Sequence, residues 1–241
     1  MALALEADCE RLLDRKVTEC NCVTFETVEA IRFCKDHHRY FYGKRQLTSF
    51  SRFLETVYPI KKEELEAVKL ARPGLLEHAA ERGSRVNAYA DQYVLMGSVE
   101  LPTGEWQDVA DRVECFVNWF DKAKPEVLGV QQIVYDLEDG IAATKDYDLR
   151  FDGTTGTSVI CDMKCTANPD WTWKLQLGCH QVYTLRGLPV MVLHINPDKY
   201  AKIGGVKLLS YDWHECMTMF DAARQWWRQI QKAKNKTGAN G

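Results

Sequence analysis

Two short β-favouring segments on either side of a turn constrain the fold of this chain most. Residues 146–151 alternate polar and apolar side chains, residues 153–156 are Gly-Thr-Thr-Gly, and residues 158–164 are again β-favouring. Alternation with a period of two, interrupted by glycines, is typical of a β-hairpin. We therefore expect two strands here, with Asp148 on the first and Asp162 on the second.

The second strand carries an Asp-x-Lys triplet. Asp162 and Lys164 point to one face, and Cys161 and Met163 point to the opposite, buried layer. If Asp148 faces the same way as Asp162, two carboxylates and one ammonium converge. Carboxylates suit Mg²⁺ or Mn²⁺, which bind through one or two of them and fill the other positions with water. A lysine beside them can orient or deprotonate an attacking water, so the pattern predicts metal-assisted phosphodiester hydrolysis.

The segment after this strand has helical periodicity. Between residues 171 and 185, two adjacent helix faces carry Leu175, Cys179 and Val182 on one and Gln176, His180 and Tyr183 on the other. An Asp-x-Lys triplet alone is common by chance and more often carries solvated charges near a turn. A strand ending in this triplet, followed by a short loop and a helix that bears Gln176, is a much rarer combination.

Together these segments resemble the PD-(D/E)xK nuclease superfamily. The likeness is strongest to its RecB-type exonuclease branch, to which phage exonucleases and the mitochondrial genome-maintenance exonuclease belong. The segments that carry it are Tyr147-Asp148, Asp162-Met163-Lys164 and residues 176–180. Upstream, the phage-type segments H-x-Y…G…L-x-S-V-T, R-G-x-x-V-H and G-Y-A-G-T are similar to residues 38–50, 80–87 and 140–144. The likeness spans residues 33–183.

The resemblance implies a metal-dependent exonuclease and gives roles to residues at matching positions. The implied metal ligands are Asp148, Asp162 and the backbone carbonyl of Cys161, and the implied cofactor is Mg²⁺ or Mn²⁺. The implied catalytic residues are Asp148, Asp162, Lys164 and Gln176. Lys164 would position the water, and Gln176 would orient Lys164 or the scissile phosphate.

The first aspartate of this site has two candidates. Counting forward from Gly140 leads to Asp146, which lies on the same strand face as Asp148. The alternation that follows and the shorter spacing to Asp162 favour Asp148, so we take Asp148 as the first ligand and Asp146 as the alternative. Many members of the family add a glutamate. Glu114, which lies beside the apolar stripe of the helix expected at 106–121, is one candidate for that ligand. Gln131 or Gln132, on the strand expected at 127–135, is at the other position where relatives tend to have glutamate.

Six further residues are candidate DNA contacts, namely Arg82, Arg85, Asn87, Trp173, His180 and Tyr183. Two of them depart from the family pattern, since Asn87 stands for the histidine of R-G-x-x-V-H and His180 for the tyrosine of Gln-x-x-x-Tyr. The basic and aromatic stretch at residues 37–45 has two interpretations. It is either a hairpin that stacks on bases and contacts phosphates, or a strand pair whose aromatic side chains pack on the body.

Length and composition fit an enzyme with one substantial core. The chain has 241 residues, 46% of them hydrophobic, and a net charge of −3, which does not itself indicate nucleic-acid binding. A local basic groove can coexist with an acidic remainder. Acidic residues interrupt the apolar start, and no stretch is long enough to span a membrane. We therefore expect a cytoplasmic protein, in the host cytoplasm if it is viral, with free thiols.

The expected fold is α+β, with a mixed central sheet of the restriction-endonuclease type flanked by helices. A single nuclease domain would cover residues 1–241, and residues 1–105 would be mainly helical with a hairpin near 31–48. The catalytic core would occupy residues 106–231, and residues 232–241 would form a disordered tail. Helices are expected at 1–17, 49–57, 63–82, 106–121, 171–185 and 213–234, and strands at 127–135, 146–151, 158–164, 190–196 and 206–212.

The resemblance thus implies a DNA exonuclease acting in phage DNA replication, recombination or DNA degradation. DNA is the expected partner, with a single-strand-binding or annealing protein and a homo-oligomer as further expectations. Two alternatives are a structure-specific or restriction-like endonuclease of the same superfamily, and a catalytically silent DNA-binding or protein-interaction module. The four core residues argue against the silent module, because clustered carboxylates are costly to keep without a function.

Overall fold

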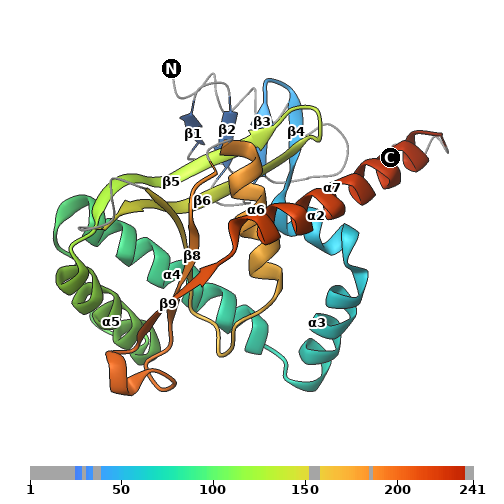
Figure 1. The fold of residues 1–241 in the computed structure, drawn as a ribbon. Helices are drawn as coiled ribbons and strands as arrows, with labels where there is room; N and C mark the ends of the chain where they lie inside the picture. Colours follow the sequence, from blue (N-terminus) through green and yellow to red (C-terminus); the bar gives the residue numbers. More distant parts are fainter. Residues whose placement is uncertain (1–24, 29–30, 35–38, 152–157, 185–186, 237–241) are drawn as a thin grey trace.

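The chain has an α+β fold in which helices flank a mixed β-sheet (Figure 1). The computed structural model describes residues 25–28, 31–34, 39–151, 158–184 and 187–236. Within these residues the strands follow the order β1-β2-β3-β4-β6-β7-β8-β9, and β5 pairs with β6. The α+β class and the mixed sheet expected from the sequence are confirmed.

Nine strands form the described sheet, and the two central ones, β6 and β7, are mostly buried. The strands are β1 (Phe25–Val28), β2 (Ile31–Cys34), β3 (Arg39–Tyr42), β4 (Arg45–Ser49), β5 (Glu126–Asp136), β6 (Ile141–Arg150), β7 (Val159–Lys164), β8 (Val190–Ile195) and β9 (Val206–Tyr211). The pairs β4–β6 and β7–β8 are parallel and the other pairs are antiparallel. Five of the six residues of β7 and eight of the ten in β6 are buried, which makes this pair a rigid support.

The helices lie on both sides of this sheet. They are α2 (Phe50–Val57), α3 (Pro59–Ala71), α4 (Leu75–Met96), α5 (Gln107–Ala123), α6 (Thr172–Thr184) and α7 (Trp213–Lys236), with a short 3₁₀ helix at Ala201–Ile203. Figure 1 shows α4 and α5 on one side of β8 and β9, and α6 and α7 on the other. None of the helices in the described part of the chain has the length and apolar character needed to cross a membrane.

Some helix boundaries differ from those expected from the sequence, among them the start of α3, which lies at Pro59 and not at residue 63. The break at Pro73-Gly74 is confirmed, but the helix after it runs on to Met96 instead of ending at Arg82. The last helix continues to Lys236, so residues 232–236 are helical and not the start of a disordered tail. The helix expected at residues 1–17 and residues 237–241 lie outside the described residues.

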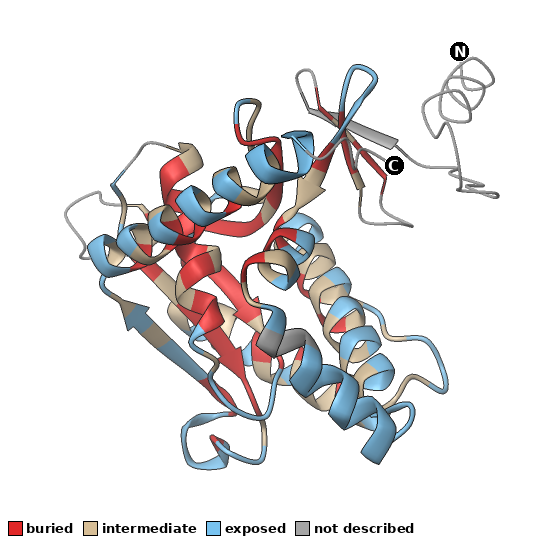
Figure 2. Ribbon diagram, turned by 90° about the vertical axis from the view of Figure 1, so that its right-hand side faces the viewer, coloured by how far each residue is buried: buried red, intermediate tan, exposed pale blue. Residues whose placement is uncertain are grey.

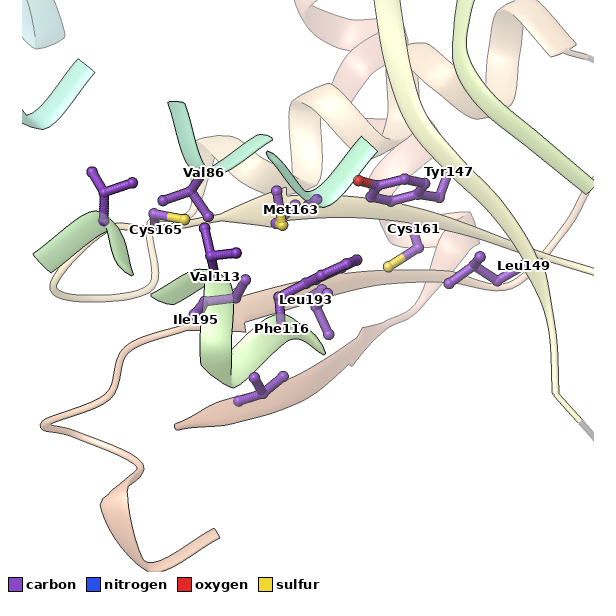
Figure 3. Close-up of a cluster of buried hydrophobic side chains, with 13 residues drawn as sticks. Val86, Val113, Phe116, Tyr147, Leu149, Cys161, Met163, Cys165, Leu193 and Ile195 are labelled. Atoms are coloured by element: carbon purple, nitrogen blue, oxygen red, sulfur yellow. The ribbon is translucent and has the colours of Figure 1, made fainter. Parts of the chain in front are cut away.

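The main apolar core fills the space between β6–β8 and the two helices α4 and α5 (Figure 3). Tyr147 and Leu149 of β6 and Cys161 and Met163 of β7 contribute to it, and Phe116 of α5 packs against them. Because these residues alternate with Asp146, Asp148 and Asp162 along the strands, the carboxylates belong to the other face. On that face two further clusters join α6 and α7 to the sheet.

The basic and aromatic stretch forms β3 and the start of β4, as expected for a hairpin. Tyr40 and Phe41 are buried, and the Tyr40 hydroxyl lies 2.8 Å from the Thr144 hydroxyl. Arg45 donates to the Leu137 carbonyl at 2.7 Å. These contacts support the interpretation that the aromatic side chains of this stretch pack on the body of the protein. Residues 37 and 38 lie outside the described residues.

Gly178 allows α6 and α7 to approach each other closely. A Cβ at this position would lie 2.1 Å from the Cys216 carbonyl oxygen and 2.8 Å from the Phe220 Cβ. We expect Gly178→Ala to lower the free energy of unfolding by about 1–3 kcal/mol, because the helices must separate. Urea unfolding followed by circular dichroism measures this change.

Gly83→Ala on α4 is the matched control for this substitution. A Cβ there meets nothing within 4 Å, and alanine favours a helix over glycine. This variant should be more stable than wild type by up to about 1 kcal/mol. Equal effects of the two substitutions would show that close packing at Gly178 is not what limits the α6–α7 contact.

Candidate active site

Asp162, Lys164 and Gln176 form a closed ring of polar contacts at the end of β7. The Gln176 amide donates to Asp162 Oδ1 at 2.8 Å, and its Oε1 accepts from Lys164 Nζ at 2.9 Å. Lys164 also forms an ion pair with Asp162. The carboxylate of Asp162 is 1% exposed and Lys164 is 20% exposed, so the ring opens toward solvent on the lysine side. The structure thus brings together three of the four predicted catalytic residues.

The ring depends on the periodicities of one strand and one helix. Asp162 and Lys164 are two residues apart on β7 and therefore share a face. Gln176 lies in the first turns of α6, whose start is anchored by Asp170. The Asp170 carboxylate accepts from the backbone N–H of Thr172 at 2.9 Å and from its hydroxyl at 2.7 Å.

The loop that joins β7 to α6 is tied to β8. His194 Nε2 lies 2.7 Å from the Thr166 carbonyl, and Asn196 donates to the Ala167 carbonyl at 3.1 Å. Because a carbonyl only accepts, His194 must carry its proton on Nε2, and its Nδ1 then accepts from the Tyr200 hydroxyl at 2.8 Å. Burial lowers the pKa of His194, so the neutral ring that these bonds require is favoured.

Asp146 lies beside Asp162 on the neighbouring strand. The pairing of Tyr147 with Cys161 places the preceding residue of β6 next to the following residue of β7. The backbone N–H of Met163 donates to Asp146 Oδ2 at 2.8 Å. Burial and then the charge of Asp162 raise the pKa of Asp146 to about 7, and Lys164 and the Met163 bond only partly offset this rise. Two carboxylates therefore share a buried site.

The Asp148 carboxylate forms a buried ion pair with Lys145. Its Oδ2 accepts from Lys145 Nζ at 2.7 Å, and both side chains are 1% exposed. The charge of this carboxylate is therefore compensated inside the protein by a lysine of its own strand. Asp146 instead interacts with Asp162 and Lys164. The geometry favours Asp146, the alternative of the sequence analysis, over Asp148 as the first aspartate of the site.

Lys164 is protonated beside these carboxylates. Burial lowers its pKa, but the charges of Asp162 and Asp146 outweigh this effect, and the net change is upward. The ammonium therefore neutralises part of the negative charge of the pair. Asp146 and Asp162 would hold a divalent cation, which would supply further positive charge beside them.

Asp91 on α4 is a carboxylate that the sequence reasoning missed. It accepts a hydrogen bond from the Tyr147 hydroxyl at 2.7 Å, and its charge contributes to the raised pKa of Asp146. It follows Asn87 by four residues, so the two side chains share a helix face. Asn87 stands where the resembling phage segment has a histidine. A carboxylate four residues after that position could therefore have pointed to Asp91 from the sequence.

The donor chemistry of the site suits a hard divalent cation. Asp146 and Asp162 supply carboxylate oxygens, and burial together with the charge of Asp162 raises the pKa of Asp146. In the described part of the chain, no group of three or more His, Cys, Asp or Glu side chains is arranged to hold a metal ion. Mg²⁺ commonly binds through one or two carboxylates and keeps several waters, so the pair fits Mg²⁺ or Mn²⁺ and not a zinc cage.

Two of the predicted DNA contacts are buried, which corrects the sequence analysis. His180 is 0% exposed and Trp173 is 5% exposed. Burial lowers the pKa of His180 to about 4, so its ring is neutral next to Lys145 and Lys164. Trp173 packs edge-on against His194. Neither side chain can stack on DNA in this structure, because α6 is covered by the sheet on one side and by α7 on the other.

The remaining predicted contacts lie on helices around the ring. Arg82 donates to the Cys165 carbonyl at 3.1 Å, one residue after Lys164. Arg85 instead pairs with Glu105 at 2.8 Å and covers the ring of Trp106. Through this bond to Cys165, Arg82 lies close to the ring. Its role in DNA binding stays a prediction.

Three other predicted residues do not join the ring. Asn87 is half-buried on α4, and Tyr183 donates to Asp139 at 3.3 Å. Glu114 is exposed on α5, which packs on the face of β6 and β7 opposite to Asp162. The Cys161 side chain lies in the apolar core, and a metal-binding role for its carbonyl stays a prediction.

No protein-family model matches the chain. No curated protein shows significant sequence similarity to it. Among solved structures, the crystal structure of LHK-Exo in complex with dAMP superposes on 67% of this chain and 93% of that chain, with 12% sequence identity and a TM-score of 0.38.

Proposed function

We propose that this chain is a divalent-metal-dependent nuclease that hydrolyses DNA phosphodiester bonds. The observation that carries the proposal is the ring of Asp162, Lys164 and Gln176 with Asp146 beside it. A chance cluster of charges near a turn would be solvated, whereas both carboxylates are buried here and the Gln176 amide connects Asp162 to Lys164. Buried like charges are costly, so their persistence in one place is typical of a functional site.

Each residue of the site has a role that follows from its contacts. Asp146 and Asp162 would hold Mg²⁺ or Mn²⁺, which supplies Lewis-acid stabilisation of the phosphate and lowers the pKa of a bound water. Gln176 bonds to both Asp162 and Lys164 and so sets the position of the lysine relative to the carboxylate. Lys164, which is 20% exposed beside Asp162, would hold the attacking water or offset the phosphate charge.

The finer assignment rests on the sequence resemblance. We infer a PD-(D/E)xK exonuclease with a restriction-endonuclease-like core, one nuclease domain over residues 1–241, and a cytoplasmic role in phage DNA metabolism. The antiparallel pair β6–β7 followed by α6 supports the core assignment, because this order delivers Asp146, Asp162, Lys164 and Gln176 to one place. An endonuclease of the same class is the alternative that a cleavage assay separates.

Digestion of end-labelled linear DNA and closed circular DNA tests this proposal. The assay compares Mg²⁺, Mn²⁺ and chelator, and compares wild type with Lys164→Ala. We expect metal-dependent loss of linear DNA only, with activity at least about 100-fold lower in the variant. Lys174→Ala is the matched control, because that lysine forms an exposed pair with Glu215.

Each result of the digestion has a distinct meaning. Cutting of circular DNA would move the assignment to an endonuclease. Full activity of Lys164→Ala would exclude the proposed site even if DNA is cut. The absence of cleavage by wild type with either metal would favour a silent DNA-binding module.

A further inference from the structure

A cavity of about 210 Å³ opens directly beside the proposed active site. It lies between α2, the middle of α3 and the start of α6, and Figure 1 shows these helices next to each other. Gln176 and Thr172 line it on the α6 side, and Phe50, Leu54 and Leu65 line it on the other. Gln176 also hydrogen-bonds to Asp162 and Lys164. Only the Gln176 side chain would therefore separate a group in this cavity from the phosphate that is cleaved.

We infer that this cavity holds a single unstacked nucleobase next to the scissile phosphate, and that the substrate is therefore a DNA strand with an unpaired end. The inference rests on the proposed function, because it assigns a subsite of the same active site. The base occupies the cavity, and the sugar-phosphate chain stays outside it. Three properties of the site carry it, namely the size of the cavity, the charges around it and an exposed aromatic ring.

The size of the cavity fits one planar ring. An apolar protein cavity of about 150 Å³ accepts benzene, so a cavity of 210 Å³ has room for a single heterocycle. Pockets that enclose larger ligands start at about 300 Å³. A nucleotide with its sugar and phosphate would therefore extend out of the cavity, toward Gln176 and the ring of polar residues.

The charges around the cavity oppose a phosphate. Glu55 lines the cavity and also the neighbouring hollow between α3 and α4, which is lined by Glu66, Glu77 and Lys69 as well. Three carboxylates thus face one lysine along this surface, and Lys69 is already paired with Glu66. A DNA backbone would be repelled here, whereas an uncharged base would not.

Trp171 provides an exposed aromatic surface next to the cavity, although its side chain does not line it. It is 48% exposed and immediately precedes Thr172 of the cavity wall. Its ring packs edge-on against Tyr58, with centroids 5.0 Å apart, which holds it in position at the end of α2. Exposed tryptophan rings serve as stacking platforms for single-stranded nucleic acids. A base inside a duplex cannot reach such a site without leaving the stack, so an unpaired end is favoured.

Oligonucleotides that lack single bases test this inference. Single strands with one abasic nucleotide at each of the three terminal positions of either end are digested with Mg²⁺ and compared with the complete strand. We expect hydrolysis to be about tenfold slower when the base that enters the cavity is missing, and unchanged at the other positions. A blunt duplex should be cut more slowly than a duplex with an unpaired tail.

Two pairs of variants connect the effect to the cavity. Leu65→Trp fills the cavity and should slow cleavage of the complete strand without slowing the abasic one, whereas Leu70→Trp is the control at an 85% exposed position of the same helix. Residues 63–71 of α3 are exposed (Figure 2), so neither substitution replaces a core side chain. Trp171→Ala should weaken binding of the complete strand about tenfold, and Trp226→Ala, also exposed, should not.

The outcomes separate this inference from the proposed function. If wild type cuts no strand with any metal, the proposed function fails. If it cuts complete and abasic strands equally and Leu65→Trp changes neither, DNA is cut but the base subsite is wrong. A change in sedimentation with Leu65→Trp, without a change in base discrimination, would show that a second copy of the chain covers the cavity and would also overturn the inference.

Discussion

Asp146→Asn should abolish metal-dependent cleavage and at the same time stabilise the metal-free protein. Activity should fall at least about 100-fold, because even groups that only support a metal ligand cost 10- to 100-fold when removed. Stability should rise because the carboxylate of Asp146 is buried next to that of Asp162, and an uncharged amide does not meet this repulsion. Loss of activity with gain of stability is typical of a functional residue in a strained position.

The pH dependence of stability makes this prediction specific. The pKa of Asp146 is about 7 in the folded chain and about 3.9 when unfolded, so between these values the folded state binds the extra proton. In chelator, wild type should therefore lose stability as pH rises from about 4 to 7, by up to roughly 4 kcal/mol. Asp146→Asn should lack this loss. Urea unfolding at several pH values measures the difference.

Asp148→Asn is the comparison that separates the two candidate aspartates. Thermal unfolding with and without Mg²⁺ reports metal binding, since a ligand that binds only the folded state raises the melting temperature. We expect the Mg²⁺ effect to disappear in Asp146→Asn and to persist in Asp148→Asn. The opposite result would make Asp148 the first metal ligand and would refute the assignment from geometry.

Lys145→Met should destabilise the protein by about 3–5 kcal/mol, the largest effect on stability that we expect. Lys145 and Asp148 are both 1% exposed and lie 2.7 Å apart, so the substitution removes the counter-charge of a buried carboxylate. His180 also lies near the Lys145 ammonium, but its ring is neutral and therefore cannot compensate the Asp148 charge when Lys145 is removed. Equilibrium unfolding in urea measures the loss.

Two controls show whether the effect comes from the broken pair. Lys174→Met removes one partner of the exposed pair with Glu215 and should change stability by less than about 1 kcal/mol. The double variant Lys145→Met/Asp148→Leu replaces both charges by apolar groups and should recover much of the loss. A double variant as unstable as Lys145→Met would point to lost packing and not to an uncompensated charge.

The local part of the site could be predicted from the sequence. Asp162 and Lys164 share a face because side chains alternate along a strand. Gln176 lies near the start of the next helix, and a short loop keeps that helix close to the end of the strand. These relations involve one strand and its next helix, so they depend on local geometry. The α+β class follows in the same way, from segments whose periods change between two and 3.6.

The choice between Asp146 and Asp148 depended on information that local patterns do not contain. Both lie on one strand face, and only the pairing of β6 with β7 determines which of them lies next to Asp162. Asp91 was missed because it comes from α4, far earlier in the chain, and meets β6 only through tertiary packing. Trp173 and His180 were placed at the surface because the sequence does not reveal that α7 covers their helix.

The ties between β8 and the loop after β7 also have a consequence for how this chain can vary. Thr166 and Ala167 are bound by His194 and Asn196, and Asp170 anchors the start of α6. An inserted or deleted residue in this connection would shift Gln176 along or around its helix and out of register with Lys164. Homologous chains should therefore keep the length of this loop and Asp170, whereas Thr166 and Ala167, which are bound through their backbone carbonyls, can be exchanged.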